Sequence, residues 1–296
     1  MNSGASDATL VRAMPLVFVL IWSTGFIVAR YGMPHAPPFK FLALRYVLSV
    51  ACFLLWIWLA GSRWPGTAVQ WRHLAVTGIL MHAGYLGGVW AAVKAGMGSG
   101  VSALIVGLQP VLTAIWLSSS GTRVDARQWL GLGLGLAGLV MVVSRKFGAG
   151  SAGDYVDPVN LLLAVGALLS ITAGTLYQKR FVAPCDVRTA NAVQLGVACI
   201  VTLPLAFFEV EAMRWNTESI GAMAWSVIVL TLGGSSLLYL LIQRGAATTV
   251  TSLFYLVPPV AAVMAWMLFD EPITAITVLG MAVTAVGVSL VVRART

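Results

Sequence analysis

The sequence predicts an all-α integral membrane protein of ten transmembrane helices, arranged as two inverted five-helix repeats around a central cavity. Apolar residues make up 59% of the 296 positions, and charged residues make up only 9%. Soluble domains carry about 45–50% apolar and about 25% charged residues. So few charges could not cover a water-facing surface, so lipid is the expected solvent for most of the chain.

The apolar residues fall into ten runs, each of a length that crosses a membrane. A helix needs about 20 predominantly apolar residues to span the hydrocarbon core. The predicted spans are residues 14–32, 38–60, 73–93, 99–119, 127–144, 158–178, 189–208, 220–242, 249–269 and 274–292. The loops between them are too short to fold alone. The polar segment before Met14 is typical of the cytoplasmic lead of a first span rather than of a removed signal peptide.

The basic residues predict the orientation. With the N-terminus inside, eleven of the 18 Lys and Arg residues fall at the cytoplasmic side and seven at the outer side. Cytoplasmic loops collect Lys and Arg, so both termini are expected in the cytoplasm of a bacterial inner-membrane protein. The net charge of +8 is spread over many short loops, which favours the lipid bilayer over nucleic acid as the partner.

The two halves of the chain align without a gap at an offset of 149 residues, which divides it into repeats at residues 1–146 and 147–296. The matched positions include a proline and a glycine stripe: Pro110 with Pro259, Gly131 with Gly280, and Gly138 with Gly287. A unit of five spans ends on the opposite side from its start, so its copy inserts upside down. Inverted repeats are common in secondary transporters, which bind substrate near mid-membrane.

Short motifs resemble EamA-type members of the drug/metabolite transporter superfamily. They are Trp22-Ser23-Thr24-Gly25-Phe26, Ala43-Leu44-Arg45-Tyr46, the proline of span four, and Asp270-Glu271-Pro272-Ile273-Thr274. The acidic junction is absent from the first half, where Gly121-Thr122-Arg123 stands. Length and layout resemble the YddG-type amino-acid exporters of that superfamily. The resemblance implies export of small metabolites by alternating access, with aromatic or other neutral amino acids as expected cargo. Multidrug export and purine or nucleoside export are the alternatives.

Polar and aromatic residues inside the spans are the candidates for substrate binding, because polar groups are costly in lipid and tend to face the bundle interior. The candidates are Trp22, Thr24, Arg45, His82, Tyr85, Ser102, Gln109, Gln194, Tyr239, Thr251 and Tyr255. His82 and Tyr85 share a helix face, which either lines the cavity or packs with His82 bonded to a neighbouring helix. Arg45 either attracts a substrate carboxylate or extends to the outer headgroups. Trp22 either stacks on the substrate or anchors at the membrane interface.

Prolines predict bends in the fourth and ninth spans, because proline removes a backbone donor and clashes with the preceding turn. Pro110, Pro258 and Pro259 are therefore candidate hinges, and static kinks are the alternative. The glycine stripes in spans five and ten let helices approach closely. They serve either internal packing of a monomer or the contact of a homodimer.

Several function classes lack their motifs. The sequence has no phosphate-binding loop, no His-Glu-x2-His zinc motif and no nucleophile elbow. We therefore expect no catalytic residues, metal or cofactor, and no intramembrane enzyme. A channel normally needs a ring of carbonyls or charges, and none is evident. No Asp or Glu lies in the middle of a span, so we expect gradient-driven movement or exchange rather than carboxylate-based proton coupling.

Overall fold

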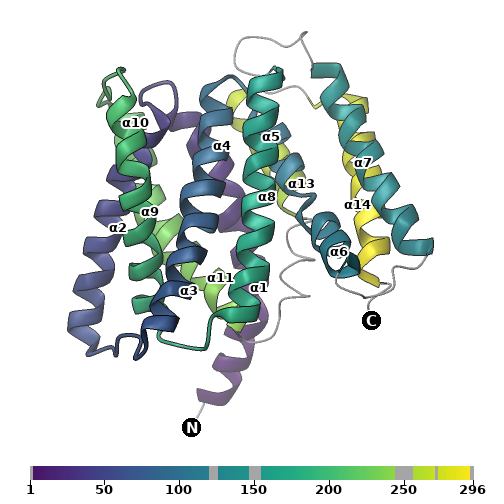
Figure 1. Cartoon of the computed structure of the whole chain (residues 1–296). Coiled ribbons are helices and arrows are strands. Elements are labelled where there is room, and N and C mark those ends of the chain that lie inside the picture. Colours follow the sequence, from purple (N-terminus) through teal and green to yellow (C-terminus); the bar gives the residue numbers. More distant parts are fainter. Residues whose placement is uncertain (1–2, 120–125, 147–154, 244–255, 271–272, 294–296) are drawn as a thin grey trace.

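A computed structural model describes residues 3–119, 126–146, 155–243, 256–270 and 273–293 (Figure 1). Five of its helical stretches are long and apolar enough to cross a membrane: Pro38–Ala60, Ala68–Lys94, Pro158–Phe181, Val187–Phe208 and Thr217–Gln243. Five shorter apolar helices accompany them: Leu16–Gly32, Ser99–Thr113, Trp129–Val143, Val257–Phe269 and Ala275–Gly287. These ten stretches fall on the ten predicted spans, and residues 249–255 of the ninth lie outside the described residues.

The helices follow one another with short connections. The first half forms α1 (Ser3–Gly32), α2 (Pro38–Ala60), α3 (Ala68–Gly78), the π-helix η1 (Ile79–Gly84), α4 (Tyr85–Lys94), α5 (Ser99–Val106), α6 (Gln109–Ser119) and α7 (Ala126–Lys146). The second half forms α8 (Pro158–Phe181), α9 (Val187–Phe208), α10 (Thr217–Trp225), the π-helix η2 (Ser226–Ser235), α11 (Ser236–Gln243), α13 (Val257–Phe269) and α14 (Ala275–Arg293). α1 begins well before the predicted start at residue 14, so the polar lead is itself helical.

Local sequence sets several helix ends. Gly61 ends α2 in the left-handed conformation at φ 60°, where glycine has no steric penalty. Asp157 and Asn160 form a reciprocal capping box at the start of α8, and Asn216 and Ser219 form another at the start of α10. These caps satisfy backbone donors that a helix leaves free at its first turn. They keep the loops short and fix where each helix leaves the bundle.

Prolines lie in the first turns of two described helices. α5 ends at Val106, and Pro110 lies in the first turn of α6, so the fourth span is interrupted at Gly107 and Leu108. Pro258 likewise lies in the first turn of α13. Proline is tolerated there because the first turn needs no backbone donor. The interruption between α5 and α6 lies against the start of α13, since a Cβ at Gly107 would lie 2.6 Å from Cγ of Pro258. That Pro110, Pro258 and Pro259 act as hinges stays a prediction.

Elements of one half pack on their counterparts in the other half. α2 contacts its counterpart α9, and α7 contacts its counterpart α14, which lies beside it in Figure 1. α5 contacts α13, so the fourth and ninth spans also meet. The pairing of η1 with α8 has its exchanged counterpart in the pairing of η2 with α1. α1 begins and α14 ends toward the same end of the bundle (Figure 1), as an even number of spans requires.

The two glycine stripes meet each other between α7 and α14. A Cβ on Gly138 would contact the carbonyl oxygen of Gly280. A Cβ on Gly287 would lie 2.5 Å from the carbonyl oxygen of Gly131. Because the counterparts of Gly138 and Gly280 are Gly287 and Gly131, the second contact repeats the first with the halves exchanged. The stripes thus serve packing inside the chain, the first of their two predicted uses.

Candidate functional site

A cavity lies where both halves meet, between α1, α2, η1, α4, α8, α9, η2 and α11. Its polar and aromatic lining residues are Trp22, Phe26, Arg45, His82, Tyr85, Trp90, Gln178, Asn191, Gln194, Ser235 and Tyr239. The space open to the centres of water molecules is about 40 Å³. One water needs about 10–15 Å³ of such space, so this conformation admits a few waters. A metabolite can enter only if side chains or helices move.

Arg45 is a buried cation in the wall of this cavity. Its side chain is held inward, because Nε donates to Oγ1 of Thr231 at 3.0 Å and the guanidinium lies 5.8 Å from the ring centroid of Trp90. Arg45 is 3% exposed, and its Nη1 has no hydrogen-bond partner. Among the described residues, no acidic side chain forms an ion pair with it. The side chain therefore points into the bundle and not toward the outer headgroups.

A second polar pair faces the same cavity. His82 and Gln194 both line the cavity where η1 packs against α9, and Nε2 of Gln194 has no hydrogen-bond partner. His82 is the counterpart of Thr231 at the repeat offset, and Gln194 is the counterpart of Arg45. The pair of Arg45 and Thr231 joins α2 to η2, and the equivalent pair of Gln194 and His82 joins α9 to η1. The hydroxyl of Tyr46 also donates to the His82 carbonyl at 2.8 Å, so the backbone there is engaged as well.

The two π-helices occupy equivalent positions in the two halves. Shifted by the repeat offset, η1 falls inside η2. π-helices are rare and occur frequently at functional sites. The sequence reading expected regular α-helical spacing between His82 and Tyr85, and η1 ends between them. The wider turn still leaves both side chains in the cavity wall.

Aromatic rings form one side of the cavity. The rings of Trp22 and Tyr85 are parallel to within 1°, with centroids 6.1 Å apart. Trp90 stacks on Phe41 at 4.7 Å behind the wall. Trp22 therefore faces the bundle interior rather than the membrane interface. The arrangement gives the cavity a flat apolar face next to its polar groups.

Six of the predicted binding residues line the cavity: Trp22, Arg45, His82, Tyr85, Gln194 and Tyr239. That they bind substrate stays a prediction. Thr251 and Tyr255 lie outside the described residues. Three others are placed elsewhere: Thr24 accepts from Nε1 of Trp225 at 2.9 Å, Gln109 donates to Oγ1 of Thr175 at 2.9 Å, and Ser102 is buried in α5. Ser102 and Gln109 belong to different helices, because α5 ends at Val106 and α6 begins at Gln109.

Five polar or aromatic cavity residues are not among the predicted binding residues: Phe26, Trp90, Gln178, Asn191 and Ser235. Gln178 precedes two basic residues and was assigned to the end of span six, although α8 continues to Phe181. Asn191 lies three residues before Gln194 on one helix, and that spacing places both on one face. This spacing could have identified Asn191 as a cavity residue from the sequence. No sequence pattern predicted a cavity position for Trp90 or Ser235, because their positions depend on how the helices pack.

Charged contacts between the halves close one end of the bundle, which we call the charged end. It lies opposite the marked N-terminus in Figure 1, where residues 33–37 meet residues 209–216. The Glu209 carboxylate accepts from the backbone N–H groups of Phe39 and Lys40 at 2.9 and 2.8 Å, at the start of α2. Lys94 forms an ion pair with Glu211 at 2.7 Å. Carboxylates are favoured at a helix N-terminus by the helix dipole.

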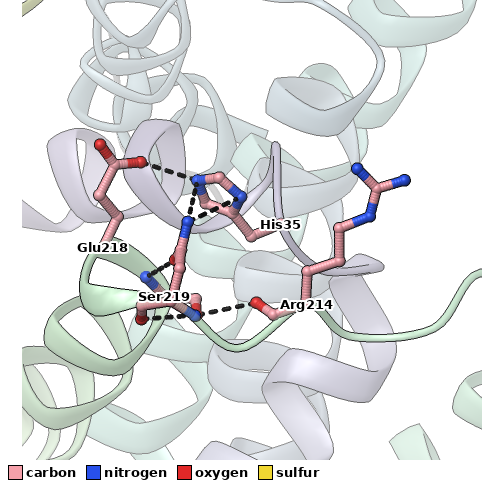
Figure 2. Close-up of polar contacts among 5 residues, drawn as sticks. His35, Arg214, Glu218 and Ser219 are labelled. Carbon is pink, nitrogen blue, oxygen red and sulfur yellow. Dashed lines mark hydrogen bonds and ion pairs between the residues drawn. The ribbon is translucent and has the colours of Figure 1, made fainter.

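A second group of contacts at the charged end surrounds His35 (Figure 2). Nε2 of His35 lies 2.7 Å from Oε2 of Glu218, and the His35 carbonyl accepts from the backbone N–H of Arg214 at 2.7 Å. The Ser219 hydroxyl donates to the Arg214 carbonyl at 2.9 Å, which holds this loop in place. The Asn216 amide also lies against the His35 ring. The first loop of one half is thereby tied to the loop that precedes α10.

The opposite end is joined by contacts of a different kind among the described residues. Nδ1 of His73 lies 2.7 Å from the Tyr177 hydroxyl. The Thr189 hydroxyl donates to the Arg63 carbonyl, and Nε2 of Gln70 donates to the Ala183 carbonyl, both at 3.3 Å. No ion pair crosses between these loops in the described part of the chain. Neutral hydrogen bonds of this length are weaker than the charge-assisted bonds at the charged end.

Two titratable groups lie in the loop before α9, outside the membrane spans. Asp186 caps this helix and pairs with Arg188 at 2.6 Å, and hydrogen bonds from Arg188 lower the pKa of the Asp186 carboxyl. Burial raises the pKa of the Cys185 thiol, whose sulfur lies 3.0 Å from the Tyr239 hydroxyl. The loop therefore connects directly to the cavity wall through Tyr239.

Comparisons with known proteins agree with this architecture. The chain matches the model of the EamA-like transporter family twice, over residues 12–144 and 159–293. It is 24% identical over 287 residues to the uncharacterized transporter YvbV of Bacillus subtilis, which covers 94% of this chain and 90% of that one. It is 25% identical over 275 residues to the uncharacterized inner membrane transporter YedA of Escherichia coli K12, covering 92% of this chain and 87% of that one.

A third relative is the "Probable amino-acid metabolite efflux pump" of Escherichia coli K12, which is 22% identical over 281 residues, covering 90% of this chain and 89% of that one. A solved crystal structure superposes with a TM-score of 0.67 over 96% of both chains at 19% identity, which shows the fold. The two family matches cover both halves of the chain, and neither the family nor the relatives are enzymes. This multi-pass membrane protein belongs to the EamA-like transporter family.

Proposed function

We propose that this protein is a secondary transporter that exports small carboxylate-bearing metabolites of the amino-acid kind across the bacterial inner membrane by alternating access. One observation carries the proposal. Arg45 is a buried cation in a cavity shared by both halves, with an unpartnered Nη1. An unpaired buried charge is costly, and a carboxylate offers guanidinium the geometry for two parallel hydrogen bonds. The name of the efflux pump among the relatives points to the same class of cargo.

The repeat supports alternating access. We propose that residues 1–146 and 147–296 are inverted copies around this cavity, because the contacts of α2 with α9 and of α7 with α14 join counterparts. In such a pair the substrate site lies between the copies, and rocking one copy against the other exposes it to each side in turn. The interruption before Pro110 lies against the start of α13 at Pro258, and these two places are the proposed hinges.

The charges at the loops favour one orientation. We place both termini in the cytoplasm, since most Lys and Arg residues then lie inside. The charged end then faces outward, and the structure corresponds to a form closed to the outside. Multidrug or purine export is less well supported, because neither class requires the unpaired cation at Arg45.

Counterflow tests the carrier mechanism against a channel. Purified protein in liposomes preloaded with an unlabelled carboxylate substrate is expected to accumulate the labelled compound transiently and saturably. Alternating access gives this exchange because the loaded site reorients with substrate bound. Protein-free liposomes are the control. A steady ionic conductance without saturable exchange would identify a channel and contradict the proposal.

Weakening the charged end is expected to open the outer side. In Glu209→Ala the two backbone donors at the start of α2 lose their carboxylate. Hydrogen bonds to charged groups contribute about 1.5–3 kcal/mol, so the equilibrium should shift about tenfold or more toward the outward-open form. The measurement is the labelling rate of Ser235→Cys in the cavity by a membrane-impermeant maleimide added outside, with Cys52, Cys185 and Cys199 replaced.

Lys179→Ala is the matched control for this measurement, because Lys179 is exposed in the last turn of α8 at the opposite end. Its labelling rate is expected to match that of the parent protein. An unchanged rate in Glu209→Ala as well would show that this carboxylate does not hold the outer side closed.

A further inference from the structure

Three buried donors in the described cavity lining have no hydrogen-bond partner. They are Nη1 of Arg45, Nε2 of Gln178 and Nε2 of Gln194, and each of these residues is at most 3% exposed. A buried donor without a partner costs about 1–3 kcal/mol. The cavity therefore favours an occupant that brings acceptor oxygens.

The cavity also lacks a negative charge. None of the described lining residues is Asp or Glu. The acidic residues of the described α8–α10 region stand at helix ends or in loops: Asp157, Asp186, Glu209, Glu211 and Glu218. The acidic residues of the whole sequence all fall outside the centres of the predicted spans. A substrate ammonium would therefore have no carboxylate to pair with inside the membrane.

Charge balance separates two kinds of carboxylate. A simple carboxylate neutralises Arg45, so the loaded cavity carries no net charge. A zwitterionic amino acid adds an ammonium as well and leaves the loaded cavity with the unbalanced charge of the empty one. Uncompensated charge is strongly disfavoured in a low-dielectric interior. A simple carboxylate therefore gains the full free energy of pairing with Arg45. A zwitterionic amino acid must also place its ammonium within the same small cavity.

The apolar wall describes the rest of the ligand. The parallel rings of Trp22 and Tyr85 present a flat surface beside Arg45 and His82. Phe26 and Leu86 extend this surface. Planar and aliphatic groups of a ligand gain free energy by burial there, roughly in proportion to apolar area. The amide nitrogens of Gln178 and Gln194 can then donate to a further carbonyl oxygen.

We propose that the cargo is a monoanionic carboxylate with an apolar or aromatic body, in which the amino group is absent or acylated. This inference rests on the proposed function and narrows its substrate class. N-acylated amino acids fit every requirement: the carboxylate pairs with Arg45, the acyl oxygen accepts from the glutamine amides, and no ammonium is present.

Pairs of compounds that differ only in the amino group test the inference. Phenylalanine, leucine and serine are each compared with their N-acetyl derivatives in counterflow with liposomes that contain the full-length protein, at pH 7.5. The N-acetyl forms are expected to exchange at least tenfold more efficiently than the free amino acids, with the largest rate for the phenylalanine derivative. Protein-free liposomes correct for passive permeation of the protonated, uncharged forms of the N-acetyl amino acids.

Membrane potential gives a second readout. A monoanion carries one net charge, so net uptake should respond to a potassium diffusion potential that is positive inside. A tenfold accumulation is expected at about 60 mV, since one elementary charge gains about 2.3 kcal/mol per 100 mV. Uptake of a zwitterion by itself would not respond.

The outcomes separate the two proposals. Free amino acids that exchange as well as or better than their N-acetyl forms would overturn the charge-state inference and leave the transporter proposal intact. In that case the aromatic faces of Trp22 and Tyr85 would be the expected partners of the ammonium. Saturable exchange of neither series would overturn both proposals.

Discussion

Arg45→Gln is expected to lower the transport efficiency for carboxylate substrates by at least about 30-fold. Removing one partner of a buried, hydrogen-bonded charge pair costs about 2–5 kcal/mol, and about 1.4 kcal/mol corresponds to a factor of ten. The effect should appear chiefly as a raised apparent KM in proteoliposome exchange, because the contact is made with bound substrate. The transport efficiency of Arg45→Lys should lie between those of Arg45→Gln and the parent protein, since lysine keeps the charge and loses the planar pair of donors.

The same substitution should not destabilise the empty protein. In the substrate-free form Arg45 is a buried charge with an unpartnered Nη1, and replacing it with a neutral amide removes that cost. Thermal unfolding in detergent should therefore show an equal or higher midpoint for Arg45→Gln. A lower transport efficiency together with an equal or higher unfolding midpoint would show that the variant has lost substrate binding and is not misfolded.

Arg180→Gln is the matched control, because Arg180 also lies over an aromatic ring, at 5.3 Å from that of Phe181, but is exposed and away from the cavity. Its transport should equal that of the parent protein. Transport by Arg45→Gln at the parent rate and KM would remove Arg45 from the binding site.

Gly138→Ala and Gly287→Ala are expected to be the most destabilising small substitutions in α7 and α14. Each new Cβ would contact a backbone carbonyl of the facing helix, and Gly287 would also bring its Cβ within 2.5 Å of the Gly135 nitrogen. Backbone atoms cannot rotate away, so the helices must separate and lose packing along the whole contact. Overpacking of this kind typically costs about 1–3 kcal/mol, and more where backbone is involved.

Gly133→Ala is the matched control on α7, because nothing lies within 4 Å of a Cβ there. It should leave the protein unchanged or slightly more stable, since alanine has the higher helix propensity. The measurement is the midpoint of thermal unfolding in detergent for the three variants. Parent-like midpoints for Gly138→Ala and Gly287→Ala would show that α7 and α14 are not in close contact in the membrane.

The double variant adds a further test of the contact. Separating the helices to relieve one clash relieves the other, so the combined loss should be smaller than the sum of the single losses. KM for the remaining folded protein should not change, because none of the cavity-lining residues described above belongs to α7 or α14.

The sequence by itself determined where the chain crosses the membrane and that it is duplicated. Lipid offers no hydrogen bonds to the backbone, so each apolar run of sufficient length must be helical. The spans at 38–60 and 158–178 therefore appear within a few residues of α2 and α8. The repeat was visible because matched prolines and glycines keep their sequence offset whatever the tertiary structure.

The choice between the two uses of the glycine stripes needed the tertiary structure. Spacing alone predicts a surface that allows close approach, whichever helix lies opposite. The contact of Thr284 with the Gly135 carbonyl at 3.4 Å joins two positions that are 149 residues apart, which is the repeat offset itself. The partner of the first stripe is thus the second stripe.

Only the tertiary structure decided which polar side chains share the cavity. Arg45 and Thr231 are 186 residues apart and meet because α2 packs against η2. Ser102 and Gln109 have the same polar character but do not line the cavity, since α5 packs against α13 and α6 packs against α8. Helical periodicity fixes the relative direction of neighbouring side chains on one helix. The rotation of that helix against its neighbours is set by packing of both halves together, which local sequence does not encode.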